Sequence, residues 1–272
     1  MKIVIIAANS NTYHGFSIEE AVVGIREAGF RYIELTATKG WTEHVFPTDS
    51  FQRLLSVRDL LKENGLTPIA MSGHCNLMDT MRISDFENNI ALAAFFGCKY
   101  IVSSIGEAHL KDNASVGNDV VAEHISKLIP MLEKYKLMLV LEVHGCEHGS
   151  GAIINEIVKL INSPLVKINY DTANALFYSD VDLIEDIKGC VGNIAYMHLK
   201  DKAGERKSWN FPAIGQGDID FKSVFEVLDD AKNDCPLSVE IEFTQNGPSD
   251  LNEVNQALKM SAEYLRKRGY TL

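Results

Sequence analysis

The feature that most constrains this 272-residue chain is a regular alternation of short β-rich runs with longer amphipathic helical patterns. Such alternation is typical of parallel strands joined by helical crossovers. The runs that predict strands are residues 3–7, 31–36, 67–72, 99–104, 137–143, 166–171, 193–199 and 236–243. The predicted helices are residues 18–28, 51–64, 83–96, 120–134, 153–161, 221–231 and 251–267, with a shorter helical segment at 181–188.

Eight strand–helix units in a chain of this length predict a (β/α)8 TIM barrel, forming a single domain over residues 1–272. Three glycines, Gly29, Gly65 and Gly97, follow predicted helices as helix C-terminal glycines do. The alternative is an open doubly wound sheet, which normally carries a glycine-rich phosphate loop after its first strand. Residues 8–12 contain no glycine, so the pattern favours the barrel.

Composition narrows the class of partner. The formal net charge is −11 and no long Lys/Arg run occurs, which argues against nucleic acid as a partner. The apolar stretch near the N-terminus is too short for a signal peptide or a membrane span, so we expect a cytoplasmic protein without a membrane partner. Five scattered cysteines without CxxC spacing predict reduced thiols. Composition leaves a small-molecule substrate and a homo-oligomer open.

Polar residues stand at the ends of the last four predicted strands, where a barrel carries its functional groups. They are Glu142 with His144, Asp171, His198, and Glu240 with Glu242. One acidic residue at a strand end is commonly a helix cap, and Asp171 alone is open to that interpretation. Several ligand-type residues inside apolar runs are costly unless something pairs them. Three carboxylates and an imidazole therefore predict one divalent metal ion: Mn²⁺, Mg²⁺, Co²⁺ or Zn²⁺.

At these residues the chain resembles the sugar phosphate isomerase/epimerase superfamily. These xylose isomerase-like TIM barrels include ketose 3-epimerases, hydroxypyruvate isomerase, inosose dehydratase and endonuclease IV. The resemblance runs along nearly the whole chain. Its best-matching segments are Leu141-Glu142-Val143-His144, Tyr170-Asp171-Thr172-Ala173-Asn174, His198-Leu199-Lys200-Asp201, Gly215-Gln216-Gly217-Asp218-Ile219-Asp220-Phe221 and Val239-Glu240-Ile241-Glu242.

The resemblance implies that Glu142, Asp171, His198 and Glu240 bind one metal ion. Glu242 is an alternative ligand on the last strand, because residues two apart return to the same face. In the epimerase members the two ligating glutamates, here Glu142 and Glu240, also act as the acid/base pair.

The implied activity is that of an isomerase or epimerase acting on a ketose, a sugar phosphate or a related small polyhydroxy carbonyl compound. The reaction would proceed by proton abstraction and a metal-stabilised enediolate. A lyase of the inosose or dehydroshikimate dehydratase type is the alternative, since it begins with the same step. An endonuclease IV-like repair enzyme is disfavoured, because Asn174 stands where that enzyme needs a histidine. The same asparagine departs from the Asp-x-x-His pattern of ketose 3-epimerases.

Further residues near the predicted barrel mouth are candidates for substrate binding. The candidates are His74, Glu107, His144, Asn174, Lys200 and Arg206. Weaker candidates are His14, Glu34, His109 and Asp201. For each of them an exposed loop position or a surface ion pair is the competing interpretation.

Overall fold

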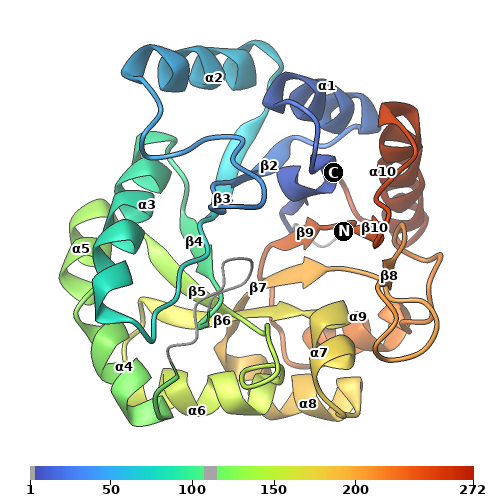
Figure 1. The fold of residues 1–272 in the computed structure, drawn as a ribbon. Coiled ribbons are helices and arrows are strands. Elements are labelled where there is room, and N and C mark those ends of the chain that lie inside the picture. Colours follow the sequence, from blue (N-terminus) through green and yellow to red (C-terminus); the bar gives the residue numbers. More distant parts are fainter. Residues whose placement is uncertain (1–3, 107–114) are drawn as a thin grey trace.

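A computed structural model describes residues 4–106 and 115–272 of the chain. Within them, eight parallel strands close into a barrel in the order β1-β2-β3-β4-β5-β6-β7-β9, and helices surround it (Figure 1). The barrel strands are β1 (Ile6–Asn9), β2 (Tyr32–Thr36), β3 (Thr67–Ser72), β4 (Tyr100–Ser103), β5 (Met138–Glu142), β6 (Val166–Asp171), β7 (Ile194–Leu199) and β9 (Leu237–Val239). The predicted TIM barrel is therefore confirmed.

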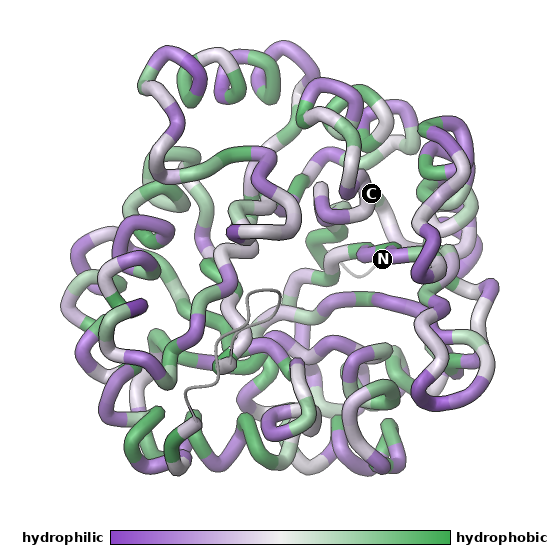
Figure 2. The backbone as a smooth tube through the Cα atoms, viewed as in Figure 1, coloured by the Kyte–Doolittle hydropathy of each residue, from purple (hydrophilic) through white to green (hydrophobic). Residues whose placement is uncertain are grey.

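The helices lie on the outside of the barrel. They are α1 (Ile18–Ala28), α2 (Phe51–Glu63), α3 (Ile83–Phe95), α4 (Asn118–Ser126), α5 (Ile129–Tyr135), α6 (Gly151–Ile161), α7 (Thr172–Tyr178), α8 (Leu183–Cys190), α9 (Phe221–Asp230) and α10 (Leu251–Lys267). Short 3-10 turns occur at η1 (Ser10–Tyr13), η2 (Thr80–Arg82) and η3 (Val191–Asn193). Purple and green alternate along the helices in Figure 2, as expected for helices with one buried face. Among the described residues, no helix is both long and apolar enough to cross a membrane.

Local sequence explains where α1 begins and ends. Ser17 caps its N-terminus and forms a capping box with Glu20, so that each side chain bonds the other residue's backbone N–H. Gly29 ends the helix with φ 96°, a left-handed conformation that favours glycine, as the sequence predicts.

Several boundaries differ from the prediction: β1 is Ile6–Asn9 and not residues 3–7, and two further differences are larger. The segment expected as one helix over 120–134 is two helices, α4 and α5, because Pro130 lacks the N–H needed to continue the first helix. The eighth barrel strand, expected to reach residue 243, ends at Val239. The expected last residue, Phe243, has φ 59°, outside the extended range, and pairs outside the barrel.

The residues after β9 join a small second sheet that sequence patterns do not reveal. Strand β10 (Phe243–Thr244) pairs antiparallel with β8 (Asn210–Phe211), which lies between β7 and α9. Two-residue strands are too short to show the alternation that identifies longer strands. This sheet ties the loop after β7 to the loop after β9 at the barrel mouth (Figure 1).

The barrel interior is layered. Side chains two residues apart on a strand share one face, so the residue two before a mouth residue lies one layer deeper. The deeper layer includes the fully buried Val140 and Tyr196, which pack in one apolar cluster with Ala7, Ala70 and Val102. Two residues further along β5 and β7, one layer nearer the mouth, are Glu142 and His198. The apolar layer therefore forms a floor beneath the polar groups of the mouth.

Candidate metal centre and active site

Four buried side chains from the second half of the chain converge at the barrel mouth. Glu142 ends β5, Asp171 ends β6, His198 lies on β7 and Glu240 directly follows β9. Each offers one ligand-type atom, and these atoms all lie within 4.8 Å of one another. The structure thus brings together the four residues that the sequence indicates as metal ligands.

Asp171 divides its two carboxylate oxygens between two tasks. Its Oδ1 accepts hydrogen bonds from the backbone N–H groups of Ala173 (2.9 Å) and Asn174 (2.8 Å), which caps helix α7. Its Oδ2 is buried and has no hydrogen-bond partner among the described residues. The nearest cationic atoms, Lys200 Nζ and His198 Nδ1, each lie 3.8 Å from Oδ2. A buried carboxylate oxygen without a hydrogen-bond partner is costly, so a cation facing Oδ2 fits this site. Capping and metal binding are therefore compatible roles.

In Glu240, likewise, one carboxylate oxygen is held by hydrogen bonds and the other faces the cluster. Its Oε1 accepts hydrogen bonds from the side-chain amides of Asn11 (2.9 Å) and Asn9 (3.3 Å). Its Oε2 lies 3.3 Å from Nδ1 of His198 and so faces the cluster. The first strand and η1 thus orient a carboxylate that follows the last barrel strand.

His198 presents Nδ1 to the carboxylates, at 3.0 Å from Oε1 of Glu142. On the opposite side of the ring, Nε2 lies 3.0 Å from Oε1 of the fully buried Glu34. An Nε2–H donated to Glu34 leaves a lone pair on Nδ1, the arrangement that metal-bound histidines usually show. Glu34 therefore lies on the far side of the imidazole from the carboxylates and is not among the described residues that line the cavity at the mouth.

The charge balance of the cluster also fits a cation. Burial raises the pKa of Glu142 to about 8; the nearby His198 opposes this, while Asp171 and Glu240 add to it. Burial also raises the pKa of Glu240, but Lys200 and, in its protonated metal-free form, His198 outweigh it and hold the value below the usual range. Carboxylates this close cannot all ionise without compensation, and a divalent ion offers it. Oxygen donors with one imidazole suit Mn²⁺, Mg²⁺, Co²⁺ or Zn²⁺.

Lys200 explains why Glu240 and Glu242 have different environments. Its Nζ lies 2.6 Å from Oε2 of Glu242 and 3.7 Å from Oε2 of Glu240, and its side chain is almost fully buried. Burial lowers the pKa of Lys200, but Glu242, Glu240 and Asp171 together keep it well above the ordinary value. Glu240 consequently joins the cluster, while Glu242 forms an ion pair with Lys200.

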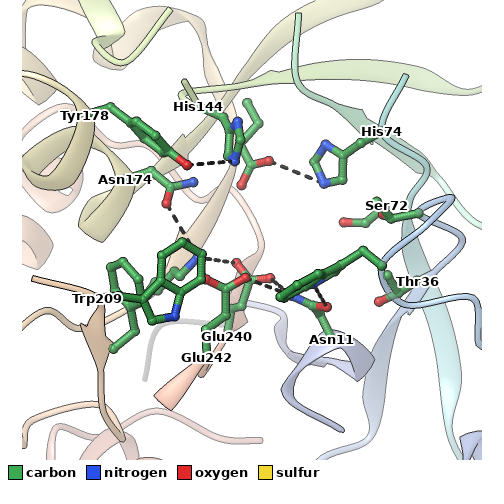
Figure 3. A pocket seen from close by; sticks show the side chains of 15 residues that line it. Asn11, Thr36, Ser72, His74, His144, Asn174, Tyr178, Trp209, Glu240 and Glu242 are labelled. Carbon is green, nitrogen blue, oxygen red and sulfur yellow. Dashed lines mark hydrogen bonds and ion pairs between the residues drawn. The ribbon is translucent and has the colours of Figure 1, made fainter. Parts of the chain in front are cut away.

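Four of the expected substrate-binding residues, His74, His144, Asn174 and Lys200, line a cavity above the cluster. His74 Nε2 lies 3.4 Å from Oε2 of Glu142, and His144 Nε2 lies 3.3 Å from the hydroxyl of Tyr178. Asn174 Oδ1 accepts from Lys200 Nζ at 3.4 Å. Figure 3 shows His74, His144 and Tyr178 across the cavity from Glu240 and Glu242.

Other sequence candidates lie elsewhere. Arg206 is exposed, donates to the backbone carbonyl of Tyr178 and lies 3.6 Å from Asp180, so the structure does not bring it to the cluster. Asp201 is buried, and its carboxylate accepts backbone N–H groups of Gly215 and Gly217, both at 2.8 Å. It therefore organises a loop. Glu107 and His109 lie outside the described residues.

Sequence patterns do not single out several residues that line this cavity, namely Asn11, Thr36, Trp41, Ser72, Tyr178, Trp209 and Phe211. Asn11 follows β1 within the polar run Asn9-Ser10-Asn11-Thr12, which is the only local sign of its role. Trp41 and Trp209 lie in loops, where an isolated aromatic residue has no surrounding sequence pattern that would predict a binding role.

Comparison with known proteins agrees with this geometry. A family model described as "Xylose isomerase-like TIM barrel" matches residues 24–268. An inosose dehydratase of Clostridium perfringens is 28% identical over 164 residues, which are 54% of this chain and 54% of the relative. The match therefore spans about half the length of that relative.

Solved structures share the fold at low sequence identity. An L-ribulose 3-epimerase superposes with a TM-score of 0.75 and 18% identity, covering 98% of this chain and 97% of that chain. The IOLI protein, solved with a bound zinc atom, superposes with a TM-score of 0.77 and 18% identity, covering both chains completely (100%).

Proposed function

The chain belongs to the xylose isomerase-like TIM barrel family, and on that premise we propose that it is a metal-dependent isomerase or epimerase of a polyhydroxy carbonyl compound. The observation that carries the proposal is the cluster of Glu142, Asp171, His198 and Glu240 opening into a cavity lined by polar side chains. These four residues would hold one divalent ion. When bound, the ion supplies Lewis-acid stabilisation of negative charge on substrate oxygen atoms.

Glu142 and Glu240 are the proposed acid/base pair. Both line the cavity, and they come from β5 and from the end of β9, on either side of β6 and β7. In the proposed reaction one carboxylate removes the proton from the carbon next to the carbonyl, and the other returns a proton to the opposite face. Two opposed carboxylates thereby permit inversion of a carbon centre.

Neighbouring side chains would orient the substrate. His74 and Asn174 line the same cavity and offer hydrogen bonds to hydroxyl groups. Asn174 carries an amide, which cannot titrate, so it would bind a hydroxyl without taking part in proton transfer. Lys200, paired with Glu242, also lines the cavity and stabilises the negative charge of Glu240 at 3.7 Å.

A dehydratase is the second candidate, favoured by the sequence similarity to inosose dehydratase. It shares the first proton abstraction and then expels a hydroxyl group as water. The two candidates differ in product, because only the dehydratase loses an oxygen atom.

The test is to incubate the Mn²⁺-loaded protein in D₂O with ketoses, ketose phosphates, neutral keto-glycosides and inososes, followed by NMR. We expect deuterium to enter the carbon next to the carbonyl in at least one substrate, with an isomeric product of unchanged formula. A dehydrated product would support the second candidate. No exchange with any compound in the metal-loaded protein would contradict both.

A further inference from the structure

A second cavity adjoins the first at the barrel mouth. The two cavities share Asn11, Trp41, Trp209 and Glu242 in their linings. The inner cavity, which contains Glu142 and Glu240, has a volume of about 30 Å³, whereas the outer one measures about 480 Å³. The inner space admits little more than the reacting atoms, while the outer volume is within the range of whole ligand sites. A compound that reaches the glutamates would therefore extend into the outer cavity.

Two indole side chains, Trp41 and Trp209, line both cavities. Trp41 stacks on His14 with ring centroids 3.9 Å apart and donates its Nε1–H to Oδ1 of Asn11 at 3.0 Å. Trp209 is fixed by edge-to-face contacts with Phe177 and Phe211, at 5.8 and 5.1 Å between ring centroids. Both rings are therefore preorganised before any ligand arrives, and both are only partly buried.

The remainder of the outer cavity combines apolar side chains, Ile241, Phe243 and Pro248, with polar ones, and no positive side chain occurs among the described residues that line it. Thr244, Gln245 and Asn246 of the loop after β9 contribute hydroxyl and amide groups, and all three are exposed. Phosphate groups are usually bound by Arg or Lys. The cation of the inner cavity, Lys200, is already paired with Glu242 at 2.6 Å. This lining suits a neutral group that combines apolar faces with hydroxyls.

From this arrangement we propose that the outer cavity binds a neutral sugar ring, linked to the unit on which Glu142 and Glu240 act. The substrate is then a glycoside-type compound of at least two rings and is not a sugar phosphate. A sugar ring offers a face of C–H groups to an indole and hydroxyls to amides, which matches Trp41, Trp209, Gln245 and Asn246. The proposal rests on the proposed function, because it names the class of substrate for the same site.

The chain provides its own reporter for this test. It contains two tryptophans, and both line the outer cavity. Tryptophan emission of the Mn²⁺-loaded protein would be titrated with cellobiose, lactose, maltose and sucrose, and with glucose, fructose and glucose 6-phosphate. We expect a saturable change with at least one disaccharide, at a dissociation constant at least about 10-fold below those of its component sugars. Equal affinity for disaccharides and single sugars, or tighter binding of the phosphate ester, would overturn the proposal.

Variants connect that binding to the outer cavity. Trp209→Ala, with Trp41 as the remaining reporter, should weaken disaccharide binding by roughly 10-fold, as expected for losing an aromatic contact. Phe51→Ala is the matched control, because Phe51 is an aromatic residue 66% exposed on α2, away from both cavities. If Trp209→Ala binds Mn²⁺ like the wild type and keeps its disaccharide affinity, the proposal is wrong. Gln245 is exposed, so Gln245→Ala is not expected to perturb folding, and it should also weaken disaccharide binding. Unchanged affinity in that variant would contradict the role proposed for Gln245.

Failure of this proposal can be separated from failure of the proposed function, because binding requires no turnover. Disaccharide binding without any proton exchange would contradict the proposed function alone. Proton exchange in single sugars, without a disaccharide preference, would contradict the outer sugar site alone.

Discussion

The carboxylate of Glu34 lies 3.0 Å from Nε2 of His198, on the side of the imidazole opposite the three carboxylates of the cluster. Glu34 is itself fixed by the hydroxyl of Tyr196, which donates to its Oε2 at 3.0 Å, and by Ser72. A residue of β2 therefore sets which nitrogen of a β7 histidine faces the proposed metal ion.

Replacing Glu34 by Gln should weaken Mn²⁺ binding by about 10–100-fold, the usual effect of losing a group that orients a metal-bound histidine. Isothermal titration of the metal-free protein measures this. Glu43→Gln is the control, because Glu43 is exposed in the loop after β2. Wild-type affinity in Glu34→Gln would show that the contact with His198 does not serve metal binding.

Asp171→Asn should separate the two tasks of that side chain. An asparagine keeps an oxygen that caps α7, so the free energy of unfolding of the metal-free protein should change by less than about 1 kcal/mol. Mn²⁺ affinity should fall by at least about 10-fold, because the anionic oxygen is lost. Urea unfolding and metal titration of the same preparation test both. A large loss of stability with intact metal binding would mean that Asp171 is mainly a helix cap.

Glu142→Gln and Glu240→Gln should each lower turnover by about 10²–10⁴-fold, the range for removing a positioned proton-transfer group. Each variant retains an oxygen that can contact a metal ion, so metal content would be measured alongside the rate. NMR in D₂O follows deuterium incorporation into the substrate for the wild type and for each variant. Should both variants hold metal and exchange deuterium at the wild-type rate, another base, such as His144 or Lys200, must act.

The buried His44 should make the folded protein less stable in acid. Burial lowers its pKa to about 4, and its Nε2 lies 3.1 Å from the backbone carbonyl of Phe16. As the pH falls below about 6.5, His44 becomes protonated in the unfolded chain but stays neutral in the folded chain. The free energy of unfolding therefore keeps its full value above about pH 6.5 and declines towards pH 4, by up to about 3 kcal/mol.

Comparison of variants isolates this effect from other titrating groups. Urea unfolding of the wild type and of His44→Gln would be measured at pH 7 and pH 5. The stability loss between these values should be smaller in the variant, by about 2 kcal/mol. Identical losses in the two proteins would contradict the assignment to His44.

The barrel and three of its four converging residues were predictable, because each depends on local pattern plus one rule. Strands alternate with helices, and the ends of parallel strands meet at one mouth, so Glu142, Asp171 and His198 had to lie near one another if the barrel closed. The choice between Glu240 and Glu242 was not local. It depends on β9 ending at Val239 and on the buried Lys200, neither of which follows from alternation along a strand.

Other parts of the site depend on contacts between distant segments. Glu34 was a weak candidate, because only the fold places it behind His198, which is 164 residues away in the sequence. Helix α7 follows β6 directly and was not among the predicted helices, although Asp171 was open to a capping role and Asn174 was a candidate for substrate binding. Trp41 and Trp209 come from separate loops, and their shared cavity exists only once both loops are placed.

The hydrogen bonds from Asn9 and Asn11 to Glu240 join residues more than two hundred positions apart, across the seam where β1 pairs with β9. Contacts of such long range form late in folding, because a long loop must be closed first. A chain in which that seam is open would still possess Glu142, Asp171 and His198, but would lack an oriented fourth carboxylate. Gain of full metal affinity during refolding would consequently mark the moment of barrel closure, which makes the metal a kinetic probe of the final folding step.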